Sequence, residues 1–408
     1  DIENSYKIAS TSGIGRTNLY VHWDQLEPEK GNFDWRVTDI MMKLNEKYNL
    51  KTTLYLSVIN ADRLGPFPSW MGNQIIGKSL ETDTVRVLDA ILSRYENIDY
   101  VIFAADIDYY LQRGTGTIPS FVEFFNNVSS EIKSNHPDVK IGNSLSLENV
   151  INKDLVPNGV RELTPQLEMG DFIALSYKPT DVVGDIDRTP LEAIGDLEKT
   201  LEIFSSQKLA FFEISWSTSE FVNGYDIHQE QFIKSSLNFF EENESQIEFF
   251  TVSRLFDKPK GSCVSQDIQS IGGSGFSSNS FRLERIDEYF CNSGLIDTKQ
   301  NAKPAWEQLR QTIAEDILEK AWHEDSNAYT AAYGADDLDA ASLMIGLMGL
   351  VDCTDSRFMA TIDAIDKRLR MGPTVFRYLA DDGLPGREGG FFICASWLVD
   401  SFYKAGRR

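Results

Sequence analysis

Short β-rich runs alternate with amphipathic helical stretches from residue 18 to about residue 312, and this alternation constrains the fold more than any other feature. Repeated βα units of this kind build a parallel sheet that is covered by helices. The expected helices, with apolar residues three and four apart, lie at 40–48, 82–95, 121–135, 191–205 and 229–242. The seven expected strands lie at 17–22, 50–58, 100–104, 140–142, 172–176, 209–212 and 247–252.

Seven strands fit an α/β fold, a (β/α)8 TIM barrel that lacks its first strand or starts just after it. The alternation stops after residue 312. Beyond it the pattern is helical, with apolar segments at 338–351 and 391–403 and one apolar face made of Phe358, Ile362, Ile365 and Leu369. We therefore predict two domains, a barrel over 1–312 and an all-α segment over 313–408.

Charge and composition exclude several classes of function. Asp and Glu (62) outnumber Lys and Arg (39), and the net charge of −23 repels phosphate backbones and anionic lipid surfaces. No apolar stretch reaches the length of a membrane-spanning helix. We expect neither nucleic-acid nor membrane partners. The first residues show no signal peptide, so a soluble protein is expected whose location, secreted or cytoplasmic, stays open.

The four cysteines, Cys263, Cys291, Cys353 and Cys394, are widely spaced, with no C-x-x-C pair and no neighbouring histidine. This spacing indicates neither a zinc site nor a disulfide scaffold, so all four are expected to be structural thiols. The histidines also lack metal-like spacing. We expect no metal and no cofactor.

Two carboxylates directly follow expected strands, where a barrel places its active site. Asp106 ends one strand and Glu213 ends another. An acid in this place is also a common helix N-cap or salt-bridge partner. Aromatic rings at strand ends, which can stack on the apolar faces of sugars, favour carbohydrate binding over that alternative. The rings in question are Tyr20, Trp23, Trp70, Tyr109, Tyr177 and Trp216.

Longer runs carry a family resemblance that covers residues 1 to about 312. The run VHWDQLEPEKGNFDW at 21–35 resembles the second-strand motif of clan A glycoside hydrolases, W-x-x-x-E-P-x-x-G-x-[FY]-D-W. The run FFEISWSTS at 211–219 is similar to the seventh-strand nucleophile motif of the same enzymes. The runs NSGLID at 292–297 and KPAW at 303–306 are similar to the closing segment of several of these barrels.

This resemblance implies that Glu213 is the nucleophile of a retaining mechanism, with Tyr177 beside it. The acid/base of the family lies in a G-N-E motif, and the matching residues here are Ala104, Ala105 and Asp106. Asp106 is therefore the implied acid/base, one methylene shorter than usual. The stacking tryptophan of the eighth strand is replaced by Val252. The substrate-binding residues that we expect are Trp23, Trp70, Asp108, Tyr177 and Trp216.

The tail carries a second, independent resemblance. The runs DGLPGREGGF at 382–391 and CASWLV at 394–399 resemble the C-terminal part of bacterial family 15 glycoside hydrolases, the glucoamylase and trehalase group. That family folds as an (α/α)6 toroid, of which this tail supplies only part. The resemblance implies Glu388 as a general base and Arg377 as a sugar contact. A partial toroid leaves apolar faces uncovered, which predicts self-association through the tail.

Three readings of function follow. The first is a hydrolase that cleaves the O-glycosidic bonds of a β-linked oligo- or polysaccharide with retention. The second is a catalytically silent carbohydrate-binding barrel, motivated by Ala105, Asp106 and Val252. The third is an inverting α-glucosidase or trehalase activity of the tail. The sequence leaves open the sugar, the linkage, endo or exo action and the oligomeric state.

Overall fold

Seven parallel strands form the sheet of the N-terminal part in the computed structural model, which describes residues 2–61, 63–111, 118–151, 167–263, 280–380 and 389–407. Each strand pairs with the next along the chain, and β3 (Arg63–Leu64) adds an antiparallel edge to β2. All seven expected strands are confirmed. They are β1 (Arg16–Val21), β2 (Lys51–Asn60), β4 (Ile98–Ala105), β5 (Lys140–Ser146), β6 (Phe172–Tyr177), β7 (Leu209–Ile214) and β8 (Ile247–Val252).

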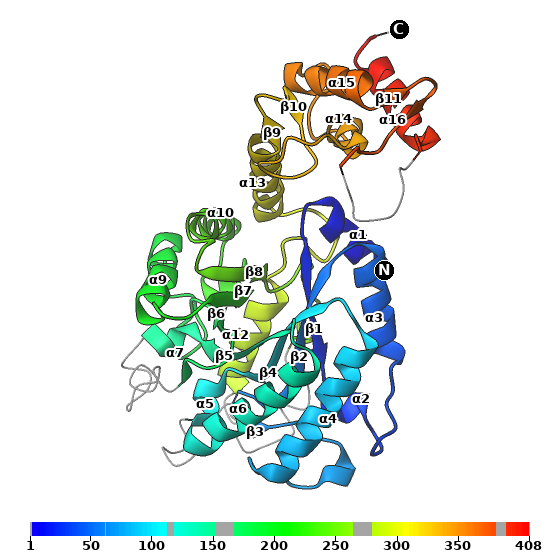
Figure 1. Ribbon diagram of the computed structural model, residues 1–408. Helices are drawn as coiled ribbons and strands as arrows, with labels where there is room; N and C mark the ends of the chain where they lie inside the picture. Colours follow the sequence, from blue (N-terminus) through cyan, green and yellow to red (C-terminus); the bar gives the residue numbers. More distant parts are fainter. Residues whose placement is uncertain are drawn as a thin grey trace. The chain divides into compact units, whose positions relative to one another are not determined.

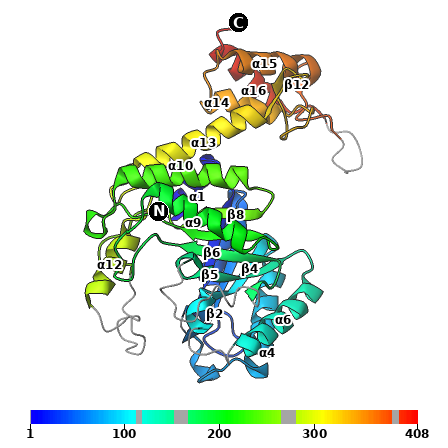
Figure 2. The ribbon, with the colours of Figure 1, turned by 90° about the vertical axis from the view of Figure 1, so that its left-hand side faces the viewer.

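Helices between the strands cover the outside of the sheet, as the βα alternation predicts. α4 lies beside α6 and α9 lies beside α10 in both views (Figures 1 and 2). The helices of this part are α1 (Ile2–Thr11), α2 (Trp23–Leu26), α3 (Arg36–Lys47), α4 (Lys78–Arg94), α5 (Ile107–Leu111), α6 (Ile118–Asn135), α7 (Leu147–Ile151), α9 (Pro190–Ile203), α10 (Asp226–Glu242), α12 (Ser280–Cys291) and α13 (Pro304–Lys320).

The sheet curls so that its first and last strands face each other. The Asn18 side chain on β1 donates to the Phe212 carbonyl of β7 at 2.9 Å and to the Thr251 hydroxyl of β8 at 3.2 Å. No backbone ladder joins β8 to β1 among the described strands, and this is the gap that an eighth strand fills in a closed barrel. The predicted α/β barrel with seven of its strands is therefore confirmed.

Aromatic side chains fill the interior of the barrel. Tyr100 lies 4.8 Å from Phe249 and 5.3 Å from Phe172, measured between ring centroids. The Arg16 guanidinium stacks 4.5 Å from the Tyr100 centroid and pairs with Asp99, so this inward-pointing cation is compensated. Glycine is required at Gly142, because a Cβ there would lie 2.6 Å from the Phe172 ring. The packed interior leaves the carboxyl ends of the strands as the open face of the barrel.

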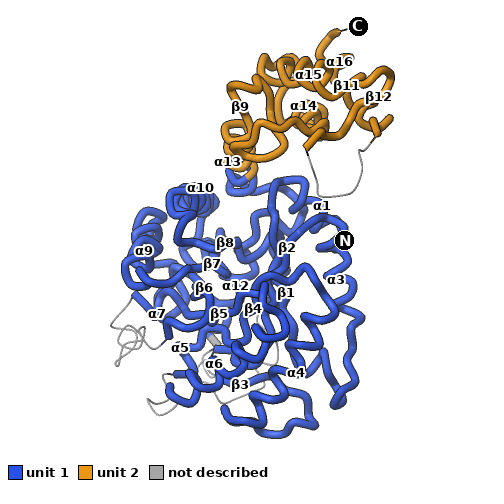
Figure 3. Tube along the Cα trace, viewed as in Figure 1, with its two compact units in different colours: residues 1–309 blue, residues 310–408 orange. Residues whose placement is uncertain are grey.

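The chain divides into two compact units, Asp1–Leu309 and Arg310–Arg408 (Figure 3). The division falls within α13, near the predicted domain boundary at residue 312. Across the described ranges, no helix combines the length and apolar character needed to cross a bilayer.

The second unit has its own core, built around the predicted apolar face. Phe358, Ile362, Ile365 and Leu369 are all buried, on or directly after α15. The elements of this unit are β9 (Trp322–His323), β10 (Ala328–Tyr329), α14 (Met344–Leu347), α15 (Ser356–Arg368), β11 (Arg370–Met371), β12 (Thr374–Val375) and α16 (Phe392–Lys404).

Two expectations for the tail were wrong in part. The predicted helix over 338–351 is a 3-10 turn (Ala340–Leu343) followed by the short α14, because Gly349 adopts a positive φ of 82° that ends the helix. The tail also contains two small hairpins, β9 with β10 and β11 with β12. α16 matches its prediction and leaves Phe392, Val399 and Tyr403 exposed, so self-association stays a prediction.

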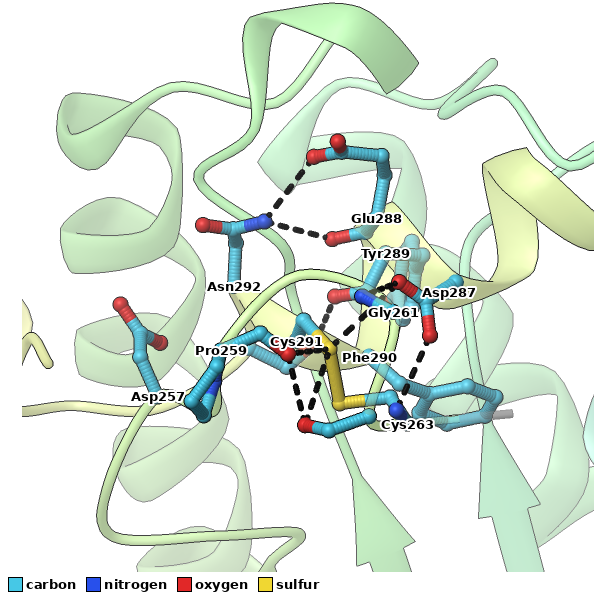
Figure 4. Close-up of a disulfide and its surroundings, with 12 residues drawn as sticks. Asp257, Pro259, Gly261, Cys263, Asp287, Glu288, Tyr289, Phe290, Cys291 and Asn292 are labelled. Carbon is cyan, nitrogen blue, oxygen red and sulfur yellow. Dashed lines mark hydrogen bonds between the residues drawn. A yellow bond between two sulfur atoms is a disulfide. The ribbon is translucent and has the colours of Figure 1, made fainter. Parts of the chain in front are cut away.

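The expectation of four structural thiols was wrong for two cysteines, which form a disulfide (Figure 4). Cys263 lies in the loop after β8 and Cys291 ends α12, with Cα atoms 5.5 Å apart. Their separation of 28 residues conceals this proximity in the sequence. The Asp287 carboxylate holds the loop by accepting the backbone N–H groups of Gly261 and Cys263 at 2.5 and 2.9 Å. Cys353 and Cys394 are free thiols.

We predict that Cys263→Ser lowers the free energy of unfolding of the barrel unit by about 3–4 kcal/mol, because the disulfide removes chain entropy from the unfolded state. Denaturant titration followed by near-ultraviolet circular dichroism measures the change. A reductant should destabilise the parent protein but not the variant. The variant Cys353→Ser is the matched control and should respond to reductant as the parent does. Equal stability of the parent and the Cys263 variant would contradict the prediction.

Candidate active site

A β-bulge in β7 aims Glu213 into the mouth of the barrel. Phe212 points into the interior, so regular alternation would turn the next residue outward. The pairing of β6 with β7 instead skips Phe212, matching Leu175 with Phe211 and Ser176 with Glu213. A bulge of this kind re-aims a side chain at a functional position. Glu213 therefore faces the same side of the sheet as Ser176.

Tyr20 on β1 donates a hydrogen bond from its hydroxyl to Glu213 Oε1. Burial and the charge of Glu213 raise the pKa of Tyr20, which keeps the hydroxyl protonated as a donor. Burial also raises the pKa of Glu213, and the charge of Asp106 raises it further. The Tyr20 hydrogen bond and the cations Lys178 and Arg254 act in the opposite direction. Glu213 is thus a partly buried carboxylate with donors and charges on several sides.

Asp106 stands directly after β4, in a backbone conformation with a positive φ of 47°. Its Oδ1 accepts hydrogen bonds from Ser176 Oγ at 2.7 Å and Ser144 Oγ at 3.3 Å. These serines point inward from β5 and β6, so three neighbouring strands hold this carboxylate at the mouth. Ser176, which donates to Asp106, is also the register partner of Glu213 across β6 and β7, so the two predicted catalytic residues lie on either side of Ser176.

A second group of partly buried polar side chains lies next to Asp106. Glu148, in the first turn of α7, accepts the Lys178 backbone N–H and the Ser146 hydroxyl, both at 2.6 Å. Burial raises the pKa of Glu148. Burial alone would lower the pKa of Lys178, but the carboxylates of Glu148 and Asp106 outweigh it and raise that pKa. The mouth is therefore a mixed array of acids and cations.

The structure corrects four of the five predicted sugar contacts, because Trp23, Asp108, Tyr177 and Trp216 are at most 1 % exposed. The Asp108 oxygens accept from the Ser146 backbone N–H and the Asn149 amide, which makes Asp108 a support for the loop after β5. Trp216 packs on Phe232 of α10 with ring centroids 5.1 Å apart. None of these side chains offers a face to a sugar.

Tyr177 points away from the barrel interior. Alternation along β6 turns Phe172, Ala174 and Ser176 inward and Tyr177 outward. Its hydroxyl donates to Asp196 of α9 at 2.9 Å, beside a cavity of about 210 Å³. The place beside Glu213 that the family resemblance gave to Tyr177 is filled by Tyr20 instead.

The W-x-x-x-E motif builds the framework around the mouth. Trp23 Nε1 donates to Glu27 Oε2 at 3.0 Å, and the Gly31 backbone N–H donates to Glu27 Oε1 at 2.6 Å. Arg86 of α4 binds the same carboxylate with two hydrogen bonds, at 2.7 and 2.9 Å. Trp70 is partly buried and donates to the Glu27 carbonyl at 3.1 Å, so its role as a sugar contact stays a prediction.

The predicted residues of the tail are only partly placed. Glu388 lies outside the described residues. Arg377 is 55 % exposed in its side chain, and its Nε lies 3.4 Å from Asp339 Oδ2. Its assignment as a sugar contact stays a prediction.

One group of metal-ligand side chains lies close together in the described part of the chain, namely Cys263, Asp287 and Cys291. The two sulfurs are joined to each other, so only the Asp287 carboxylate is left as a ligand, and a single carboxylate is too few for the usual metal sites.

Sequence reasoning missed Lys178, Arg254, Glu148 and the two serines that bind Asp106. Lys178 and Arg254 follow β6 and β8 directly or after one residue, which is the signal that singled out the acids. Glu148 follows β5 after one residue and carries the same signal. The serines lie within strands and carry none, because their contacts with Asp106 join segments far apart in the sequence.

We predict that Asp108→Asn flattens the pH dependence of stability between about pH 4 and pH 7. Burial and the charge of Asp106 raise the pKa of Asp108 from 3.8 to about 7. The folded protein then holds a proton that the unfolded chain releases, so stability falls as pH rises through this window. The difference between pH 5 and pH 8 should shrink by about 1 kcal/mol or more in the variant, measured by denaturant titration. Equal pH dependence in both proteins would contradict the prediction.

Comparisons with known proteins find different relatives for different parts of the chain. The sequence model of Glycosyl hydrolases family 15 matches residues 241–408. A trehalase of Thermoplasma volcanium is 33 % identical over 96 residues, which are 23 % of this chain and 15 % of that protein. A trehalase of Mycolicibacterium smegmatis is 36 % identical over 104 residues, 25 % of this chain and 15 % of that protein. The chain thus matches only a small part of these relatives.

Solved structures resemble the barrel at low sequence identity. GH5_18 from Bifidobacterium longum subsp. longum has a TM-score of 0.54 at 14 % identity, over 77 % of this chain and 73 % of that one. Xylanase 10B from Thermotoga maritima has a TM-score of 0.51 at 14 % identity, over 78 % and 92 % of the two chains. At such identities the likeness concerns the fold. The chain therefore joins a barrel with the fold of clan A glycoside hydrolases to a C-terminal segment that resembles glycosyl hydrolase family 15.

Proposed function

We propose that this chain hydrolyses O-glycosidic bonds of a β-linked oligo- or polysaccharide with retention of configuration, using Glu213 as nucleophile and Asp106 as acid/base. The observation that carries the proposal is the position of these two carboxylates at the carboxyl ends of β7 and β4, on either side of Ser176, which pairs in register with Glu213 and donates to Asp106 at 2.7 Å. Two carboxyl groups in one mouth are what retaining hydrolysis requires. The clan A barrel fold and the family 15 match support a glycosidase in general terms.

In the first step, protonated Asp106 gives its proton to the glycosidic oxygen while ionised Glu213 attacks the anomeric carbon. The bond to the leaving sugar breaks, and an ester joins the remaining sugar to Glu213. In the second step, Asp106 takes a proton from water, which attacks the anomeric carbon and releases Glu213. The donors Ser144 and Ser176 fix the Asp106 carboxylate, and Tyr20 fixes that of Glu213.

Asp106 also motivates the rival, a silent carbohydrate-binding barrel. Its side chain is short and its Oδ1 accepts two serine hydroxyls, which orient it toward β5 and β6. If the barrel only binds glycans, Asp106→Ala retains glycan affinity and the parent shows no turnover to lose. If the proposal holds, Asp106→Asn lowers kcat by about 10²–10⁴-fold.

The similarity of the tail to trehalases motivates a third candidate, an inverting α-glucosidase or trehalase activity. An inverting reaction needs a general acid as well as the general base Glu388, and the family resemblance implies no general acid within the tail. Release of glucose from trehalose or maltose that is lost in Glu388→Gln would favour this candidate over the barrel.

Covalent trapping tests the nucleophile. We expect activated 2-fluoro β-glycosides of glucose, mannose and xylose to include at least one that inactivates the protein and labels the peptide with Glu213, detected by mass spectrometry. The variant Glu213→Gln should remain unlabelled under the same conditions. Absence of label on Glu213 with the 2-fluoro derivative of a glycoside that the protein hydrolyses would contradict a retaining mechanism.

The pH profile tests the Tyr20 contact. Because the Tyr20 hydrogen bond lowers the pKa of Glu213, Tyr20→Phe should raise that pKa. The nucleophile must be ionised, so the acidic limb of the kcat/KM profile should move to higher pH in the variant. An acidic limb at the same pH as in the parent would contradict the prediction, because it would show that Tyr20 does not influence the pKa of Glu213.

A further inference from the structure

Two cations flank one aromatic ring beside the nucleophile. Lys178 follows β6, and its Nζ lies 6.0 Å from the centroid of the Phe290 ring. Arg254 follows β8 by one residue, and its Cζ lies 5.8 Å from the same centroid. Both charges act on Glu213. The two side chains therefore converge on the side of the mouth that Phe290 and the loop after β8 form.

These cations differ from most basic residues of the barrel. In the described ranges, neither Lys178 nor Arg254 forms an ion pair with a carboxylate. By contrast, Arg86 pairs with Glu27 at 2.7 Å and Arg94 pairs with Asp39 at 2.8 Å. The polar contacts of Arg254 all use Nη1, which donates to the Phe290 carbonyl at 2.9 Å and lies 3.4 Å from Cys263 Sγ. Most of the five guanidinium N–H donors are left for another acceptor.

Lys258 adds a third charge on the same loop. Its backbone N–H donates to the Cys291 carbonyl at 2.9 Å, which places it next to the disulfide. The charge of Arg254 acts on it, and within the described chain it has no ion-pair partner. By contrast, Lys260, two residues further on, pairs with Glu288 at 2.5 Å. The described part of this loop therefore carries two cations, Arg254 and Lys258, that form no ion pair with the described residues.

Charge balance during the reaction makes this arrangement informative. In the resting site, Glu213 partly balances Arg254. When Glu213 becomes a glycosyl ester, its negative charge is lost and a negative charge appears on Asp106, which has given up its proton. Asp106 is held by serines of β5 and β6, whereas Arg254 follows β8, so the partly buried guanidinium loses the counter-charge of Glu213, which is costly. An anionic group on the bound sugar would replace the lost charge. The planar fork of arginine matches a carboxylate in particular.

We infer that the mouth of this barrel takes a β-linked sugar that carries a carboxylate, a uronic acid, with Arg254, Lys178 and Lys258 as the groups that bind it. This inference rests on the proposed function and names its substrate class. The net charge of −23 repels anions in general. An anionic sugar therefore binds only where local cations offset this repulsion, and the mouth is such a place.

Matched pairs of substrates test the inference. We expect p-nitrophenyl β-glucuronide or β-galacturonide to be hydrolysed with a kcat/KM at least about tenfold above that of the corresponding neutral glycoside. Arg254→Gln should bring this ratio close to one, mainly through a higher KM for the uronide. Lys258→Gln should lower the ratio in the same direction and covers the case in which the Arg254 variant does not fold. The control Lys260→Gln, on the same loop but paired with Glu288, should keep the parent ratio.

Binding to the Glu213→Gln variant separates the two proposals. Calorimetry with the methyl β-glycosides of glucuronate and galacturonate, and with those of glucose and galactose, needs no turnover. Equal or stronger binding of the neutral sugar in both pairs overturns the inference. The proposed function still stands in that case if a 2-fluoro glycoside labels Glu213 in the parent protein. A preference for the uronides that depends on Arg254, without labelling of Glu213, supports the carboxylate site and overturns the hydrolytic function. Stronger binding of a 6-O-sulfo-β-glucoside than of either uronide overturns the assignment to a carboxylate.

Discussion

Two carboxylates held close together in a partly dehydrated mouth are the constraint on which the rest of the site depends. Charged groups taken from water cost free energy unless donors or opposite charges replace the water. Tyr20 donates a hydrogen bond to Glu213, and two serines donate to Asp106. Lys178 and Arg254 contribute positive charge to the group. Because these partners come from four different strands, β1, β5, β6 and β8, the mouth is assembled only when the whole sheet has curled.

In the framework behind the mouth, buried charges are likewise paired with hydrogen-bond donors or opposite charges. Glu27 is fully buried, and Arg86, Trp23 and Gly31 use both of its oxygens. In the interior of the barrel, Arg16 stacks on Tyr100 and pairs with Asp99. Near the opening, the disulfide between Cys263 and Cys291 fixes the loop that carries Arg254 and Lys258. Most buried charges of the unit thus have an ion-pair partner, whereas Lys178 and Arg254 form no ion pair with the described residues and feel the charges of Glu148, Asp106 and Glu213 at longer range.

The sequence predicted the strands well, because each strand is a short run of apolar, β-favouring residues between segments with helical periodicity. It also predicted Glu213 and Asp106, since both directly follow strands whose carboxyl ends share one face. The aromatic residues were harder to assign. Tyr177 differs from Ser176 only by one step of alternation along β6, and which of the two faces the interior depends on pairing with β5 and β7. Trp23 and Trp216 are buried by helices that local patterns do not position.

The sequence by itself determined the βα order, the helical tail and the identity of the two acids, because these are properties of short segments. The tertiary structure decided which residues meet. The bulge at Phe212 turned Glu213 inward, the curl of the sheet brought Tyr20 to it, and the return of α12 joined Cys291 to Cys263. Contacts of this kind join residues separated by 28 to 193 positions, and their geometry is fixed by packing and strand register rather than by local preference.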